Sequence, residues 1–497
     1  MNDPQKYLDH PELLMGENPF LEELSPFMTP TVMANRLSKT PLSKSPWKSL
    51  PPLYREPLLA FSTEHFAPTR MLLPVGASLQ GLIRGALVQR NPTRREEQRR
   101  TNAIGLAPGI QEITSYPRLD AAAMILAGIT GMGKTAVVKR VLSLVAPRQV
   151  VDYGPSAVCG WEKLRQVIYL YVDQPSNGSR GALLKAILLA VDHVAETDYA
   201  ELYKRTVNID TLLVLVCKVL TVHRVALLVI DEKQERNFQD SPWSNEFILF
   251  YLSLMNLGVA ILLVGNPLAF RHLQMFSQVM RRFSVGGIHT LRPSKSSDEA
   301  WWKEDLCPRI RRFSVVEHCA LDAADRAKFE FEHSAGIPAL LQQLNVECQK
   351  VALRRASGSE VTLTMEDCRL ALKSPSLKEL LTIAEQVRTT DPSTVYMQDI
   401  VGSEDGDLQD QGGFKVPSAV TVDALKKAAT QYKKFQTREL GKFTKKLQHV
   451  SELSADELQA LGVSSELLAA AEQMQEEVEA QAREKKAKVA EKKPRKT

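Results

Sequence analysis

Four short apolar runs, separated by longer amphipathic stretches, mark the middle of the chain. Each run is rich in Val, Ile, Leu or Ala and ends at a turn with Gly or a polar residue. Continuous apolar strands that alternate with helical patterns indicate an α/β fold whose central parallel sheet is buried on both faces. The runs span 121–127, 166–173, 225–232 and 259–266.

The pattern changes on both sides of these runs. Residues 1–115 are rich in Pro and Arg and weakly periodic, which predicts an extended N-terminal arm with a small helical element near 77–89. We expect this arm to bind a partner. The four apolar runs predict an α/β subdomain at 116–290, and the helical patterns of 291–388, where the strands stop, predict a helical lid.

The C-terminal part differs in composition from the rest. Residues 389–420 combine acidic residues and glycines with few apolar ones, which predicts a flexible linker to a basic helical segment at 421–497. Its lysine pairs suit DNA phosphates or an acidic partner, although a solubilising tail is the alternative. The pairs are Lys426 with Lys427, Lys433 with Lys434, and Lys445 with Lys446.

Charge and composition narrow the class of protein. Residues 483–497 carry a net +6, so the chain's total of +5 leaves −1 elsewhere, and net charge alone does not indicate nucleic-acid binding. At 497 residues, 44% hydrophobic and 24% charged, the chain is typical of a soluble protein of several domains. We find no signal-peptide pattern and expect no run long enough to cross a bilayer. The six scattered cysteines predict reduced thiols in an intracellular protein, without a zinc site or disulfides.

The segment "GITGMGKT" matches the phosphate-loop pattern G-x-x-x-x-G-K-[ST]. It lies between an apolar run and a helical pattern, which is the context that the motif requires. We expect Lys134 to contact the β and γ phosphates of ATP and Thr135 to bind Mg²⁺. The predicted nucleotide contacts are Gly128, Thr130, Gly131, Met132, Gly133, Lys134, Thr135 and Ala136.

Polar residues end the next two strands. In "LLVIDE", Asp231 is placed to hold the Mg²⁺ shell and Glu232 to polarise the attacking water. Asn266, in "LLVGN", can position that water between Glu232 and the γ phosphate, as the sensor of ring-forming ATPases does. A strand-end asparagine that caps a turn is the alternative.

Two arginines follow in "MRRFS". Arg281 or Arg282 can reach the γ phosphate of a neighbouring subunit, and a surface salt bridge is the alternative for either one. In "SAGIPALL", the turn after Pro338 contains no arginine, so we assign no sensor of bound nucleotide there.

Taken together, these motifs resemble an AAA+ ATPase, and the residues around them are similar to the TnsC family of DNA-transposition regulators. The resemblance covers about 17–390. It rests on "ENPFLEELSP", "LPVGASLQGLIRGALVQRNP", "GITGMGKT", "ALLVIDEKQ" and "AILLVGNP". Lys233 departs from the apolar residue expected between Glu232 and Gln234.

The resemblance implies a function that composition does not show. TnsC proteins form ATP-bound rings or filaments around duplex DNA and bridge a TniQ- or TnsD-type target selector to the transposase subunits TnsA and TnsB. Hydrolysis of ATP, with Mg²⁺, then disassembles the polymer. The resemblance also implies that the C-terminal segment binds the transposase and that the protein is cytoplasmic and nucleoid-associated in a bacterium.

Contacts with DNA phosphates are expected from Lys163, Arg165, Arg180 and Lys185, with solvated surface charge as the alternative for each. The arginines of 84–100 are candidates for DNA or a partner. Two other functions stay open. They are a helicase loader or replication initiator, and a signalling ATPase scaffold that does not bind DNA.

Overall fold

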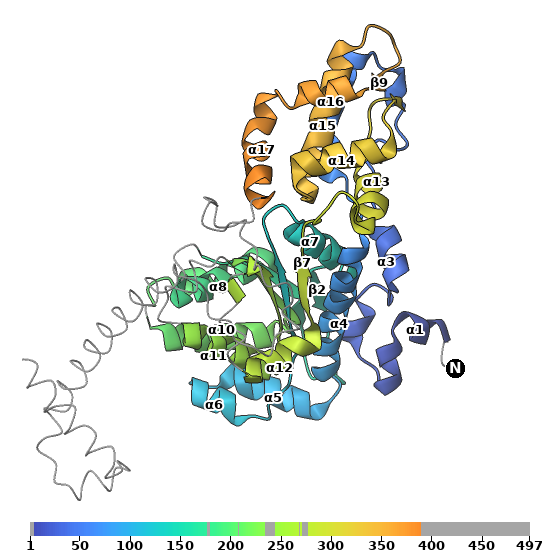
Figure 1. Cartoon of the computed structure of the whole chain (residues 1–497). Helices are drawn as coiled ribbons and strands as arrows, with labels where there is room; N and C mark the ends of the chain where they lie inside the picture. The colour runs from blue at the N-terminus through green and yellow to red at the C-terminus, as the bar shows by residue number, and fades with distance from the viewer. Residues whose placement is uncertain are drawn as a thin grey trace, which may run out of the picture. The chain divides into compact units, whose positions relative to one another are not determined.

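A parallel sheet of five strands, in the order β4-β5-β6-β1-β7, organises the fold (Figure 1). The computed structural model describes residues 4–175, 179–206, 208–233, 244–267, 269–270 and 277–388. The sheet confirms the α/β P-loop fold predicted from the apolar runs. Its strands are β1 (Ala123–Gly128), β4 (Tyr169–Asp173), β5 (Leu227–Lys233), β6 (Ala260–Gly265) and β7 (Ile288–Leu291).

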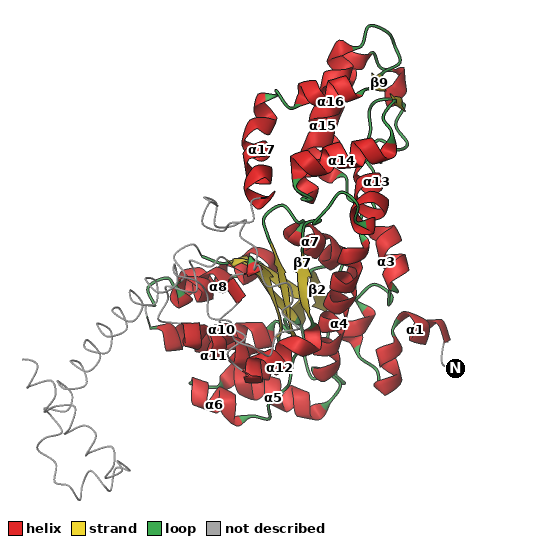
Figure 2. Ribbon diagram, viewed as in Figure 1, coloured by secondary structure: helices red, strands yellow, loops and turns green. Residues whose placement is uncertain are grey.

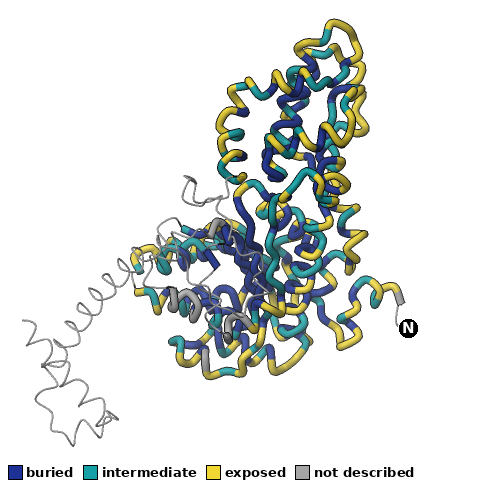
Figure 3. Tube along the Cα trace, in the orientation of Figure 1, coloured by how far each residue is buried: buried dark blue, intermediate teal, exposed yellow. Residues whose placement is uncertain are grey.

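Helices cover both faces of this sheet, and its strands lie in the buried interior (Figures 2 and 3). Alternate residues of each strand point to opposite faces, so Val229 packs with one layer of helices and Ile230 with the other. The first layer includes α4 (Leu73–Gln89) and α7 (Lys134–Val145). The second layer consists of α5 (Arg95–Leu106), α6 (Ile110–Ser115), α8 (Arg180–Ala195), α10 (Ile209–Val222), α11 (Ser244–Asn256) and α12 (Ser277–Gly286), with α9 (Tyr199–Leu202) beside α8.

Several helices begin where a polar side chain accepts a hydrogen bond from the first turn. This arrangement satisfies backbone N–H groups that have no partner within the helix. The capping residues are Ser179 for α8, Asn208 for α10, and Asp322 and Thr364 for two helices of the lid.

The N-terminal residues fold against the core instead of forming an extended arm, so that prediction is wrong. Phe20, Leu21 and Met33 are buried in the same hydrophobic cluster as α7. The Asn18 side chain donates to the carbonyl of Leu87, 3.0 Å away. The helices here are α1 (Pro4–Asp9), η1 (Pro11–Met15), α2 (Pro19–Glu22), α3 (Pro30–Leu37), η2 (Trp47–Ser49), η3 (Pro52–Glu64) and η4 (Arg70–Leu72).

Helix α4, predicted as a small element, is instead a long helix of the core. With η4 it forms the stretch Arg70–Gln89, whose 20 residues and mean hydropathy of 1.4 satisfy the length and composition of a membrane span. The expectation that no run is long enough to cross a bilayer is therefore wrong. Half of the stretch is buried in the protein, and Leu79 and Ile83 are completely covered. This packing is that of a core helix.

The apolar run 166–173 is divided between two sheets, whereas one strand was expected. Its first part belongs to β3 (Leu164–Val167), which pairs antiparallel with β2 (Val150–Tyr153). Its second part is β4, which pairs parallel with β5. Periodicity does not distinguish these parts because Ile168, between them, is also completely buried.

The predicted helical lid follows β7. Its helices are the π-helix η7 (Trp301–Leu306), α13 (Cys307–Ile310), α14 (Ala323–Ser334), α15 (Pro338–Arg355), α16 (Met365–Ala371) and α17 (Pro375–Arg388). The lid also contains the short parallel strands β8 (His318–Cys319) and β9 (Thr362–Leu363), so the strands do not stop at β7.

The chain divides into two units, Met1–Leu408 and Gln409–Thr497. The predicted linker at 389–420 and basic segment at 421–497, with its lysine pairs, lie outside the described residues.

Candidate nucleotide site

A cavity of about 570 Å³ opens where β1 gives way to α7. Binding sites for small molecules commonly have volumes of this order. All of the phosphate-loop residues predicted to contact the nucleotide line this cavity. Asp231 and Asn266, from the ends of β5 and β6, line it as well. Parallel strands bring their carboxyl ends to one edge of a sheet, which is why residues far apart in sequence meet here.

The phosphate loop uses glycine where the backbone requires it. Gly131 and Gly133 have φ angles of +86° and +82°, in the left-handed region that favours glycine. At Gly131 a Cβ would also lie 2.7 Å from Ile337 Cγ2 of the lid. At Gly133 a Cβ would meet no atom within 4 Å, so this position faces open space.

Lys134 begins α7 and its ammonium group lies inside the loop. Nζ donates to the carbonyl of Gly128 at 2.7 Å and to that of Ile129 at 3.0 Å. The positive charge is therefore held at the helix N-terminus, where the helix dipole also favours an anion. This combination suits a phosphate group.

Thr135 and Asp231 meet at the inner end of the loop. The Thr135 hydroxyl donates to Asp231 Oδ2 at 2.7 Å, and Asp231 is only 2% exposed. A hydroxyl and a carboxylate are oxygen donors of the kind that Mg²⁺ prefers. The pair therefore fits the predicted metal site. Among the described residues, we find no larger cluster of His, Cys, Asp and Glu side chains able to hold a metal ion.

The two residues predicted to polarise and to position the attacking water lie at the ends of neighbouring strands. Glu232 follows Asp231 within β5, but its side chain lies outside the part of the chain that the structure describes. Asn266 directly follows β6, is 9% exposed and lines the cavity. Its backbone carbonyl accepts from the N–H of Ala269 at 3.0 Å. A turn therefore follows the strand at Asn266, as the alternative role of a turn-capping asparagine requires.

Two walls of the cavity were not expected from the sequence. One comes from the N-terminal segment, at Thr63, His65, Phe66, Ala67, Thr69, Met71 and Leu72, and the other from the lid, at Trp301, Leu306, Ile310, Pro338, Ala339 and Gln342. Helix α15 reaches the phosphate loop directly, because the N–H of Ala339 donates to the carbonyl of Gly131 at 3.1 Å. The motif "SAGIPALL" gave the only sequence signal for this contact.

His65 joins the two walls. Its ring nitrogens lie 3.2 Å from the carbonyl oxygen of Lys39 and 3.0 Å from that of Arg309. Burial lowers the pKa of His65 below its usual value, despite these carbonyl groups. The neutral ring donates to only one of the two carbonyls at a time.

Arg281 and Arg282 lie on α12, at the end of β1 opposite the phosphate loop. Arg282 donates to Asp120 at 2.6 Å, and Asp120 lies just before β1. The six residues of β1 span about 17 Å, so neither arginine reaches the phosphate site of its own chain. Arg281 is exposed. Any contact between these side chains and a γ phosphate must therefore be with another subunit.

The four predicted DNA contacts do not form one patch. Lys163 is exposed, whereas Arg165 binds Asp152 at 2.8 and 3.0 Å and Glu196 at 3.1 Å, and these carboxylates raise its pKa. Arg165 also reaches the last turn of α8, about 22 Å from Arg180 at the other end of that helix. Lys185 donates to the carbonyl of Lys204 at 3.2 Å.

Three of the arginines between 84 and 100 serve the core, so the DNA or partner role is wrong for them. Arg84, Arg90 and Arg100 are at most 6% exposed. Arg84 pairs with Glu12 and Arg100 with Glu97, while Arg90 donates to the carbonyl of Val225 at 2.5 Å. Arg94, Arg95 and Arg99 are exposed.

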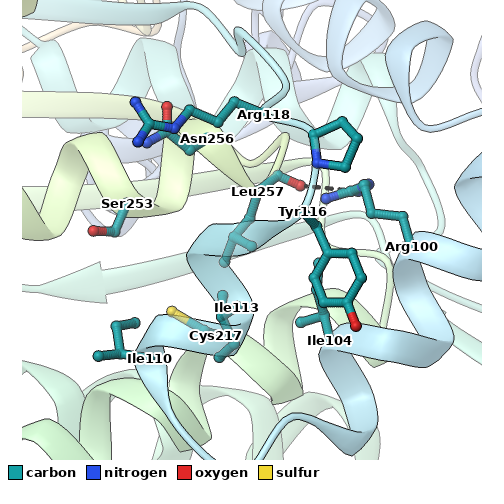
Figure 4. A pocket seen from close by; sticks show the side chains of 11 residues that line it. Arg100, Ile104, Ile110, Ile113, Tyr116, Arg118, Cys217, Ser253, Asn256 and Leu257 are labelled. Carbon is teal, nitrogen blue, oxygen red and sulfur yellow. Dashed lines mark hydrogen bonds between the residues drawn. The ribbon is translucent and has the colours of Figure 1, made fainter.

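A second cavity lies beneath α6, away from the phosphate loop (Figure 4). Its volume is about 20 Å³, enough for a water molecule and far too small for a nucleotide. Arg100 borders it and donates to the carbonyl of Leu257 at 3.2 Å. This second cavity is therefore no candidate for nucleotide binding.

The sheet, the phosphate loop and the acidic strand end define an α/β P-loop domain with the AAA fold. Comparison with known families agrees, because residues 118–274 match the AAA domain model. An AAA domain in general binds ATP with Mg²⁺. No curated protein matches the chain.

Solved structures that are similar to part of this chain include the following three. Aeropyrum pernix Orc1, in complex with DNA, has 21% identity and a TM-score of 0.33, over 56% of this chain and 64% of its own. Pyrobaculum aerophilum Cdc6 has 13% identity and a TM-score of 0.34, over 56% and 66%. The Thermotoga maritima RuvB Holliday junction branch migration motor has 13% identity and a TM-score of 0.28, over 56% and 67%. The chain thus spans less than two thirds of the length of the first two.

Proposed function

We propose that this protein is an ATP-dependent regulator of DNA transposition that assembles on duplex target DNA. The proposal takes the family from the resemblance to TnsC and takes the role of the nucleotide from the cavity. That cavity is bounded by the N-terminal segment, the phosphate loop and the lid, so a bound nucleotide contacts all three. This shared lining of the cavity is the main support for the proposal, because a nucleotide bound there fixes the N-terminal segment, the phosphate loop and the lid relative to one another.

The residues of the site have distinct roles in this proposal. Lys134 binds the β and γ phosphates, and Thr135 and Asp231 hold Mg²⁺, which supplies charge stabilisation for phosphoryl transfer. Glu232 accepts a proton from the attacking water, and Asn266 orients that water. ATP therefore keeps the subunit in its assembly-competent form, and hydrolysis ends that state.

The arginines of α12 provide the link between subunits. Their position at the far end of β1 suits a contact with the γ phosphate of the next subunit in a ring or helical filament. The assembled protein then bridges a TniQ- or TnsD-type target selector to TnsA and TnsB. Its place is the bacterial cytoplasm, on the nucleoid.

Electron microscopy of the full chain with duplex DNA tests this function directly. We expect rings or filaments on the duplex with a non-hydrolysable ATP analogue, and none with ADP. A parallel ATPase assay, with and without duplex, tests whether DNA regulates hydrolysis. Assemblies that form equally well without DNA, with an ATPase rate that duplex does not change, would support a signalling scaffold instead.

A second experiment separates the proposed regulator from a helicase loader or replication initiator. Purified TnsA, TnsB and the target selector are added to the DNA-bound assemblies, and insertion of a donor element is measured. We expect insertion to require this protein and ATP. Capture of a replicative helicase without any effect on insertion would favour the loader.

A further inference from the structure

The edge strand β4 brings a tyrosine to the predicted Mg²⁺ site. Tyr171 lies opposite Val229 in the parallel pairing of β4 with β5, and Asp231 comes two residues later on the same face of the sheet. The Tyr171 hydroxyl donates to Asp231 Oδ2. That same oxygen accepts from the Thr135 hydroxyl at 2.7 Å. Two hydroxyl groups therefore converge on one oxygen of a buried carboxylate.

The tyrosine ring is itself held in place. It packs in the hydrophobic cluster shared by α7 and the sheet, and the Lys139 ammonium of α7 lies 4.8 Å from its centre. The packed ring therefore holds its hydroxyl group at Asp231, to which that group donates.

We propose that Tyr171 is a positioning residue for Mg²⁺, because it fixes the Asp231 carboxylate beside Thr135. The inference rests on the proposed binding of ATP with Mg²⁺ and adds a residue to that site. Partners that orient a metal-binding carboxylate commonly change metal affinity by about 10- to 100-fold when they are removed. Tyr171 does not line the cavity, so its effect on the nucleotide is confined to the metal end.

Tyr171→Phe tests the proposal, since it removes the hydroxyl and keeps the ring against Lys139. Tyr169→Phe is the matched control. Tyr169 lies two residues earlier on the same strand and the same face, and within the described residues its hydroxyl has no hydrogen-bond partner. Both variants and the unmodified chain are titrated with a fluorescent ATP analogue, first in EDTA and then at increasing MgCl₂.

We expect Tyr171→Phe to bind the analogue in EDTA as the unmodified chain does. The Mg²⁺ concentration that gives half of the metal-dependent gain in affinity should rise about 10-fold or more. Tyr169→Phe should leave both quantities unchanged. The melting temperature of each variant shows that the fold is intact.

Two results would overturn the role of Tyr171. One is the same Mg²⁺ dependence in Tyr171→Phe and Tyr169→Phe. The other is an equal loss of affinity in EDTA and in Mg²⁺, which would indicate a general structural effect. Failure of the unmodified chain to bind the analogue under any condition would instead refute the proposed nucleotide function, so the two failures are distinguishable.

Discussion

Arg55 connects the N-terminal segment to the lid through a buried ion pair, and its removal should loosen the wall of the nucleotide cavity. Its side chain is 0% exposed and donates to Glu317 Oε1 at 2.6 Å. It also donates to the carbonyls of Leu50 at 2.8 Å, Lys48 at 3.1 Å and Ser359 at 2.9 Å. Arg55→Ala therefore leaves the Glu317 carboxylate, 9% exposed, without its cation.

The expected magnitude follows from this burial. Breaking a buried ion pair by removing one partner costs about 3–5 kcal/mol, because the remaining charge is left without compensation. The chain provides a matched control. Arg354 and Glu56 also join the lid to η3, but their side chains are 58% and 26% exposed. Such an exposed pair contributes about 0–1 kcal/mol, so Arg354→Ala should have a small effect.

Urea denaturation followed by tryptophan fluorescence measures the free energy of unfolding of each variant. The double variant Arg55→Met with Glu317→Met removes both charges, so it should recover the part of the lost stability that comes from the unpaired Glu317 carboxylate. Since η3 ends at Glu64 and the residues from His65 to Leu72 that follow it form a wall of the cavity, Arg55→Ala should also bind ATP more weakly than Arg354→Ala. Equal destabilisation by Arg55→Ala and Arg354→Ala would refute the reasoning, and so would a double variant no more stable than Arg55→Ala.

Further predictions address the chemistry and the assembly. Lys134→Ala should abolish ATP binding in a fluorescence titration and assembly on DNA by microscopy, and normal ATP-dependent assemblies would contradict the switch. Glu232→Gln should bind ATP but hydrolyse it about 10² to 10⁴ times more slowly, giving long-lived assemblies, and an unchanged rate would remove Glu232 from catalysis. Loss of charge at Arg281 or Arg282 should reduce hydrolysis and spare nucleotide affinity in the monomer. Mixing with Lys134→Ala subunits should restore some activity, whereas lost monomer affinity would indicate a role within the chain. Deletion of 400–497 should spare ATPase activity and DNA-dependent assembly but abolish capture of the transposase in a pull-down, and normal capture would place that contact elsewhere.

The local sequence was enough to predict which phosphate-loop residues line one cavity. The phosphate loop depends on glycines with positive φ and a lysine at a helix start, which are properties of one short segment. The parallel sheet was predictable because strands covered on both faces must be apolar along their length. Asp231 and Asn266 were found because the carboxyl ends of parallel strands share an edge.

Only the tertiary structure determined which distant segments complete that site. Tyr171 reaches Asp231 because β4 lies beside β5, and strand order does not follow from hydrophobic period. Arg84, Arg90 and Arg100 looked available to DNA but pair inside the core, since the sequence pattern does not show which carboxylates or carbonyls will meet a charge.

The N-terminal segment shows most clearly that the sequence pattern does not predict contacts between distant residues. Its sequence is rich in proline and weakly periodic, which predicted an arm, yet it is bound along the core and the lid. Arg55 and Glu317 are separated by 262 residues, and the Gln342 side chain donates to the carbonyl of Ser62. Local composition describes how a segment behaves alone, whereas burial and hydrogen bonds with distant residues decide where it folds. The sequence by itself therefore determined the chemistry of the phosphate site, and the tertiary structure determined what encloses it.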